Sequence, residues 1–292
     1  VNYRKDMSSP VQGWEGCSRL SPYLAWGAIS MKQVYQAART RKEALRAMEQ
    51  DGAAIDRRWF GALQSFEARL RWHCHFTQKL EDEPRLEFEN LARVYDGLRE
   101  DAFDEDRFDA WCAGQTGYPM VDACIRALQA GGWINFRMRA MLVSFSSYHL
   151  WLHWRRPGLF LGRLFLDFEP GIHWSQTQMQ SGTTGINTVR IYSPRKQVLD
   201  QDPDGVFIRK YVPELADFPK AFLAEPHRAP REQQERAGCV VGRDYPAPVV
   251  DHATAYQEAR DRIYRVRRTA EARDEAQRVV KKHGSRKSPA RR

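Results

Sequence analysis

The chain has 292 residues, of which 42% are hydrophobic, so it is long enough to bury one large core or two small ones. Its net charge of +9 suits an anionic partner, but the last twelve residues carry six lysines and arginines and no acidic residue, so the rest is only mildly basic. The five cysteines form no CxxC pair and we find neither a signal peptide nor a transmembrane run, so we expect a cytoplasmic protein with no bound metal and no membrane. The sequence does not determine the oligomeric state, for which a monomer is the expectation.

Helical patterns dominate the chain, and no convincing run of alternating strand residues is found. Ser21 and Pro22 form a typical helix start, and apolar residues recur at helical spacing between Trp59 and Phe76. In chain order, helices are expected at 22–50 with a break at 27–30, at 56–80, as two shorter helices within 87–113, at 119–130, at 136–154, after Pro203, and at 252–282. The predicted fold class is therefore all-α.

Residues 167–198 break this pattern because they form a long polar segment without periodicity. Such loops inside compact domains are usually functional or disordered, and the Trp, Met, Ile and Tyr content of this one argues against disorder. From about residue 225 the composition turns polar and charged. We expect a helical domain over 1–225 and a polar, basic C-terminal extension over 226–292, whose charged helix is exposed.

Two small groups of residues could carry chemistry. The segment CSRLS at 17–21 places two hydroxyls and an arginine at a helix start, where free backbone N–H groups and the helix dipole could hold a diphosphate. Arg139 would lie in an otherwise apolar helix, where a buried arginine needs a carboxylate, and Asp167 is its natural partner. By themselves, these features favour an ordinary helix start and a plain core salt bridge.

Two longer segments point to a family. CSRLSPYLAWGAIS at 17–30 and TGYPMVDACIRALQAGGWINFRMRAMLVSF at 116–145 resemble the flavin-binding helical domain of the photolyase/cryptochrome family, in the family's order and at compatible spacing. WHCHF at 72–76 and SGTTGIN at 181–187 resemble a short photolyase-like group that consists of the flavin domain only, without an antenna domain; the alternative is a fragment of a longer member of the family. The resemblance covers roughly residues 1–220 and implies a helical fold, FAD, blue light and damaged DNA.

The resemblance also implies a set of residues around FAD. The CSRLS segment would hold the phosphates, with Cys17 where the family has Thr, and Arg139 and Asp167 would pair beside the flavin ring. His173 would face flavin N5, where it could donate a hydrogen bond or carry a pH-dependent proton; the alternative is a surface-loop histidine. The full implied set is Tyr3, Cys17, Ser18, Arg19, Leu20, Ser21, His73, Arg139, Asp167, Phe168, Glu169 and His173.

Trp154 matches the middle tryptophan of the family's three-member electron relay, and we take it with His173 as the candidate catalytic pair. The flavin-proximal relay position is Thr177 here, and the outer position falls near Asp101, so two of the three relay members are missing. Trp154 could equally be a core residue. Other tryptophans that could form a path are Trp133, Trp151 and Trp174.

The substrate side of the resemblance is mixed. Positions that match the family's dimer-packing tryptophan and DNA contacts are Trp72, Arg137 and Gln197. Positions that depart from it are Arg69 for a glutamate, Phe136 for an asparagine (Asn135 is adjacent), Met179 for a tryptophan and His73 for a flavin-contacting arginine. A different substrate, a different pose or no repair all stay open.

Three functions follow from these observations. The first is a light-driven lyase in which reduced FAD donates an electron to a pyrimidine dimer flipped out of DNA, with single-stranded DNA the easier substrate. The second is a cryptochrome-type photoreceptor that signals through the C-terminal extension. The third is a helical DNA-binding protein without a cofactor. The sequence favours the lyase over the photoreceptor, and both over the third function.

Overall fold

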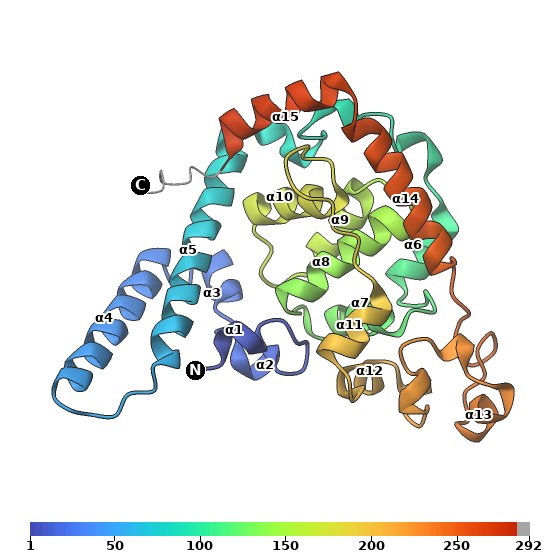
Figure 1. The fold of residues 1–292 in the computed structure, drawn as a ribbon, viewed down its shortest axis with the longest axis horizontal. Helices are drawn as coiled ribbons and strands as arrows, with labels where there is room; N and C mark the ends of the chain where they lie inside the picture. Colours follow the sequence, from blue (N-terminus) through green and yellow to red (C-terminus); the bar gives the residue numbers. More distant parts are fainter. Residues whose placement is uncertain (285–292) are drawn as a thin grey trace.

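The structure is a computed structural model that describes residues 1–284, and within that range the chain is built from helices without a strand (Figure 1). This confirms the predicted all-α class. The helices are α1 (Tyr3–Asp6), α2 (Gly13–Gly16), α3 (Ser21–Ala25), α4 (Met31–Gln50), α5 (Arg58–Asp82), α6 (Glu105–Cys112), α7 (Pro119–Gly131), α8 (Phe136–Ser144), α9 (Arg155–Leu164), α10 (Pro170–Ser181), α11 (Pro194–Gln201), α12 (Val206–Tyr211), α13 (Arg231–Arg236), α14 (His252–Arg267) and α15 (Ala270–His283). A π-helix, Phe145–His149, continues α8.

The core is built around α7, whose apolar residues are buried on almost every side by α6, α8, α11 and α12. A buried carboxylate fixes its start. Asp122 accepts hydrogen bonds from the Thr116 N–H at 2.8 Å, the Thr116 hydroxyl at 2.7 Å, the Gly117 N–H at 3.1 Å and the Tyr245 hydroxyl at 2.5 Å. These four donors compensate for the removal of the carboxylate from water, so the turn before α7 is held in one conformation.

Two glycines allow α10 to lie unusually close to its neighbours. A Cβ atom on Gly171 would lie 2.7 Å from the carbonyl oxygen of Phe76 in α5, which is closer than real Cβ contacts allow. A Cβ atom on Gly158 in α9 would lie 2.9 Å from the ring of Trp174 in α10. Because glycine has no side chain, α10 can pack directly on both helices. The closely packed helices α5 and α10 together form one wall of the cavity described below.

The polar segment 167–198 is not one long loop, so that prediction is wrong: it contains α10 and α11. The reason is that α10 buries polar side chains. The Gln178 amide accepts a hydrogen bond from the Leu91 N–H at 2.7 Å and donates to the carbonyl oxygens of Leu86 at 2.9 Å and Glu89 at 2.7 Å. A helix whose buried face is satisfied by hydrogen bonds has no apolar periodicity to detect.

Two other expected helices differ from the structure. The first of the two helices predicted within 87–113 is replaced by short 3-10 turns, and only the second forms, as α6. The helix predicted over 136–154 ends with the π-helix at His149. Trp151 then adopts a left-handed backbone with φ of 55°, which no continuing right-handed helix permits.

The sequence predicts a single, exposed helix over the charged C-terminal segment, and this prediction is wrong on both points. The segment forms α14 and α15, and the Thr269 hydroxyl caps the start of α15 by accepting the Ala272 N–H at 3.1 Å. Ile263 in α14 is completely buried in a cluster with Tyr148 and Trp151. Both helices therefore pack on the domain, while the last eight residues of the basic tail lie outside the described range. Within that range no helix is long and apolar enough to cross a membrane.

Candidate functional site

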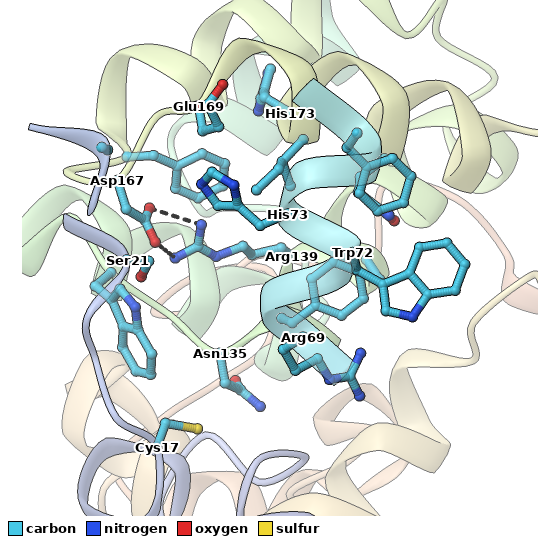
Figure 2. A pocket seen from close by; sticks show the side chains of 18 of the residues that line it. Cys17, Ser21, Arg69, Trp72, His73, Asn135, Arg139, Asp167, Glu169 and His173 are labelled. Carbon is cyan, nitrogen blue, oxygen red and sulfur yellow. Dashed lines mark hydrogen bonds and ion pairs between the residues drawn. The ribbon is translucent and has the colours of Figure 1, made fainter. Parts of the chain in front are cut away.

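A cavity of about 610 Å³ opens between α5, α8, α10 and the N-terminal segment that leads into α3 (Figure 2). This volume falls within the usual range for small-molecule and cofactor sites. All twelve residues implied to contact FAD line it, although they come from segments more than 160 residues apart in sequence: Tyr3, Cys17, Ser18, Arg19, Leu20, Ser21, His73, Arg139, Asp167, Phe168, Glu169 and His173. The fold thus brings the whole predicted set into one cavity.

Arg139 and Asp167 form the predicted ion pair in the cavity wall. Two parallel hydrogen bonds of 2.9 Å join the guanidinium to the carboxylate, and Figure 2 shows them as dashed lines. The remaining Nε–H of Arg139 donates to the carbonyl oxygen of Ile134 at 2.8 Å, and the guanidinium lies 4.3 Å from the Phe165 ring centre. Three hydrogen bonds and a ring contact hold this charged pair in a fixed orientation toward the cavity.

The segment Cys17–Ser21 presents free donors to the cavity. Arg19 has a left-handed backbone with φ of 50°, and Leu20, which follows it, is right-handed. Successive residues of opposite hand turn neighbouring N–H groups toward the same side, which suits an anion. In the described structure the N–H groups of Ser18 through Ser21 donate no hydrogen bond, so they are available to a diphosphate. Leu20, and not Ser21, is the N-cap of α3.

Cys17 stands in this segment without adding a negative charge. Burial, followed by the nearby carboxylate of Asp6, raises the pKa of its thiol. The thiol is therefore protonated at neutral pH and does not repel an anion. The replacement of threonine by cysteine leaves the backbone donors of the segment in place.

His173 lies on α10, is 8% exposed, and is not the surface-loop histidine considered above. Its Nε2 lies 2.8 Å from the carbonyl oxygen of Gly158, so Nε2 carries the proton and donates it there. Burial lowers the pKa of His173 to about 4, so the ring is neutral at pH 7. With Nε2 donating to Gly158, the neutral ring is left with Nδ1, which can accept a hydrogen bond.

The structure places some of the six predicted substrate residues in the cavity and others outside it. Four of them line the cavity: Arg69, Trp72, Phe136 and Met179. Arg137 and Gln197 do not line it: Arg137 is a half-buried residue of α8, and Gln197 in α11 is 5% exposed. Trp72 is 44% exposed and stacks on Phe76 with ring centres 5.6 Å apart, which gives the cavity mouth an accessible aromatic face.

Trp154 is completely buried and does not line the cavity. Its indole N–H donates to the side-chain oxygen of Asn90 at 2.7 Å. Its ring centre lies 6.0 Å from that of Trp174, which in turn lies 4.7 Å from the ring of His173. Trp174 therefore connects Trp154 to the cavity wall, while Thr177 occupies the wall itself.

Several cavity residues were not predicted from the sequence. Phe66 and Phe76 line the cavity with Arg69 and His73, all from α5. Their spacing of three or four residues places them on one face of the helix, and this pattern could have identified the two phenylalanines. Others contribute from segments whose approach only the fold reveals: Trp133, Phe165, Ile172, Gln176, Gln180 and Arg190.

Comparison with known proteins gives a consistent result. Residues 66–265 match the family model described as the FAD binding domain of DNA photolyase. The chain is 30% identical over 249 residues to the deoxyribodipyrimidine photo-lyase of Alkalihalophilus pseudofirmus, with 84% of this chain and 48% of that protein covered. It is 32% identical over 274 residues to cryptochrome-2 of Arabidopsis thaliana, with 91% and 42% covered.

A bacterial class III photolyase from Agrobacterium tumefaciens has a similar structure, with a TM-score of 0.79, 28% identity, and 92% of this chain and 53% of that chain covered. The chain therefore spans about half the length of the relatives it matches. FAD is the cofactor of the matched domain, and the free N–H groups and the oriented Arg139–Asp167 pair fit it, which overturns the hypothesis of a cofactor-free protein. The chain belongs to the photolyase/cryptochrome family.

Proposed function

We propose that the protein is a blue-light-driven lyase that repairs pyrimidine dimers in DNA, with single-stranded DNA as its preferred substrate. Reduced FAD, when bound and illuminated, supplies the electron that splits the dimer. Relatives named as photolyases and as cryptochromes both match the chain, so the choice depends on the cavity itself. The observation that carries the proposal is the exposed, stacked Trp72 at the cavity mouth.

Trp72 gives the mouth a flat surface on which a flipped base can stack. Phe76 supports the indole from behind at 5.6 Å, so the ring keeps its orientation when a ligand arrives. Arg69, one turn away on the same helix, lines the cavity and is exposed, and its guanidinium forms no ion pair in the described part of the chain. An aromatic face beside a free guanidinium is the arrangement that binds a base and its phosphate together.

The inner wall has groups that would hold and orient the cofactor. The free N–H groups of 18–21 would hold the diphosphate, and Asp167 would keep the Arg139 guanidinium in place beside the ring system. His173 offers Nδ1 as an acceptor and excludes a second positive charge, because its pKa is lowered to about 4. Phe165 and Phe168 line the cavity on either side of this histidine, with ring centres 5.8 and 5.1 Å from the imidazole.

Two apolar residues at the cavity mouth support the proposed preference for single-stranded DNA. Phe136 and Met179 offer apolar contacts but no strong hydrogen-bond donor or acceptor that would help extract a paired base. Extraction from a duplex requires unpairing and unstacking, whereas an unpaired lesion requires much less. The rim therefore suits a lesion that is already accessible.

A repair assay tests this proposal. Chemically reduced, flavin-loaded protein is mixed with a single-stranded oligonucleotide that contains a thymine dimer, and recovery of thymine absorbance is followed under blue light. We expect light-dependent recovery that is lost in the dark and is strongly reduced in Trp72→Ala. The matched control is Phe88→Ala, which removes an aromatic ring that is 58% exposed but lies outside the cavity. A flavin-loaded protein without repair on either strand type would contradict the proposal.

A cryptochrome-type photoreceptor is the second candidate function, because one continuous helical segment contacts both the cavity and the C-terminal helix α14. Ala140 and Val143 of α8 line the cavity, and the π-helix that continues α8 packs against α14. Hydrogen exchange of α14 in darkness and in light tests this function. Light-dependent loss of protection in a protein that lacks repair would support it, whereas unchanged protection would rule it out. Deletion of 252–292 is a poor test, because it would remove Ile263 and uncover Tyr148 and Trp151, which pack in the same buried cluster.

A further inference from the structure

The net charge of the chain is concentrated at its C-terminal end. Residues 252–292 contain 13 lysines and arginines and five acidic residues, which amounts to +8 of the total of +9. The preceding 251 residues contain 33 basic and 32 acidic residues and are close to neutral. The basic character of the protein therefore belongs to α14, α15 and the tail, and not to the cavity-bearing domain.

The two helices are fixed to the domain by specific contacts. The Glu275 carboxylate accepts hydrogen bonds from the backbone N–H groups of Arg93 at 2.6 Å and Val94 at 2.9 Å. At the end of α15, Lys282 pairs with Glu83, and His283 lies 3.3 Å from the same carboxylate. The helices thus form a rigid support, so a ligand bound there would not have to order them first.

The solvent-exposed surface of this support, which we call the basic arch, carries cations without carboxylate partners. Its members are Arg260, Arg265, Arg268, Arg273, Arg278 and Lys281, and none of them forms an ion pair within residues 1–284. The acidic residues left among them are Asp261, Glu271 and Asp274, because Glu258 pairs with Arg262 and Glu275 holds the backbone of residues 93 and 94. An excess of positive charge therefore faces solvent.

This pattern differs from the other charged helices of the protein. In α13, Arg231 pairs with Glu235 and Arg236 pairs with Glu232, each at a spacing of four residues. Such pairs neutralise the surface of a helix. In α15 the one acidic–basic pair at this spacing, Asp274 and Arg278, forms no ion pair within residues 1–284, so these side chains stay exposed to solvent.

The basic arch is separate from the cavity. None of the residues that line the cavity comes from α14 or α15. Figure 1 shows the two helices running one after the other along the edge of the molecule, away from the N-terminal helices. With 16 and 14 residues they extend about 24 and 21 Å, which together exceed one turn of duplex DNA.

We propose that the basic arch is a second nucleic-acid surface, which binds the phosphate backbone of undamaged duplex DNA without regard to sequence. Five of its six cations are arginines, whose guanidinium groups bind phosphate through two parallel hydrogen bonds. An anionic membrane fits less well, because the apolar residues Ile263 and Val279 face the domain and leave no continuous apolar stripe for insertion. The arch holds the protein on DNA while the cavity stays free for a lesion.

The test uses two variants of the full chain that lose the same number of charges. The arch variant is Arg265→Gln, Arg268→Gln, Arg278→Gln and Lys281→Gln. The control variant is Arg228→Gln, Arg231→Gln, Arg236→Gln and Arg243→Gln, whose arginines all form ion pairs outside the arch. Fluorescence anisotropy with an undamaged duplex of about 20 base pairs is measured between about 50 and 200 mM salt.

We expect the arch variant to lower the slope of log K against log salt by about three to four, since each lost phosphate contact contributes roughly one. The control variant should keep the slope of the parent. Equal losses in both variants would show that only bulk charge matters and would overturn the proposal. Arch-dependent binding to vesicles of anionic lipid, without binding to duplex, would also overturn it. Flavin absorbance and repair of single strands are read in parallel, so failure of the cavity function is recognised separately.

Discussion

His173 and Gly158 are joined by a hydrogen bond of 2.8 Å between the imidazole Nε2 and the backbone carbonyl oxygen. The bond links α10 to α9 and fixes the histidine as its Nε2-protonated tautomer. Because the ring is buried in the cavity wall, a second proton would place an uncompensated charge there. The same contact therefore determines both the geometry of the wall and its charge.

The stability of the protein should depend on pH because of this histidine. Burial lowers its folded-state pKa to about 4, below the value of about 6.5 expected in the unfolded chain. Between these values the unfolded state binds the proton and the folded state does not, so the free energy of unfolding falls as pH decreases. The full difference is on the order of 3 kcal/mol, and urea unfolding from pH 7 to 4 measures it. His173→Asn, which keeps a donor, should give a shallower pH dependence; an identical one would contradict the assignment.

The Arg139–Asp167 pair should contribute to stability as well as to cofactor retention. Asp167→Asn leaves the guanidinium with a neutral partner in a mostly buried position, where breaking such a pair costs about 2–3 kcal/mol once the partial exposure of Arg139 is considered. We expect reduced flavin content and a lower urea midpoint in the cofactor-free protein. A double-mutant cycle with Arg139→Gln separates the two residues, and strictly additive effects would show that they do not interact.

Gln178 should be among the most sensitive positions outside the cavity. Gln178→Leu conserves size but leaves the Leu91 N–H and the carbonyl oxygens of Leu86 and Glu89 without their partner. We expect a loss of about 2–4 kcal/mol, measured by denaturant unfolding. The control is Gln277→Leu on the exposed side of α15, which should change stability little. Equal effects of the two substitutions would argue against the buried network.

The route of electrons to the flavin can be tested with the buried tryptophans. Trp174 lies between Trp154 and the cavity wall, so Trp174→Phe and Trp154→Phe should each slow light-driven reduction of the bound cofactor. Chemical reduction should be unchanged in both. Trp111→Phe, which changes an equally buried tryptophan elsewhere in the core, is the control. Photoreduction at the parent rate in both test variants would exclude this route.

The helices that can be predicted from the sequence are those that bury apolar side chains. The long helix α5 was recognised because its apolar residues recur at helical spacing. The helix α10 was missed because Gln178, Ser181 and Thr183 exchange hydrogen bonds where apolar residues would otherwise be found. Packing of α14 was missed because a few residues, such as Ile263, suffice to dock a highly charged helix. A helix that buries polar side chains, or that packs through only a few apolar residues, has no hydrophobic periodicity that the sequence could reveal.

The candidate site was predicted through residues whose chemistry requires a partner. Arg139 needs a carboxylate if it is buried, and Asp167, which follows the apolar segment 159–166, is the partner predicted for it. Arg99 shows the limit of this reasoning. It is 2% exposed, stacks 4.5 Å from the Trp151 ring, and within residues 1–284 it has no carboxylate partner, so no rule of charge pairing identifies it. The hydrogen bond that sets the tautomer of His173 likewise depends on a backbone atom that the sequence does not mark.

The contacts of α15 determine when the segment near residue 90 can complete its folding during translation. The carboxylate of Glu275 holds the backbone at Arg93 and Val94, and Lys282 and His283 bind Glu83. The segment near residue 90 therefore cannot reach its final state until almost 200 further residues have left the ribosome. Because Asn90 in that segment also binds Trp154, the interior beside the cavity is completed by a helix that is synthesised almost 200 residues later.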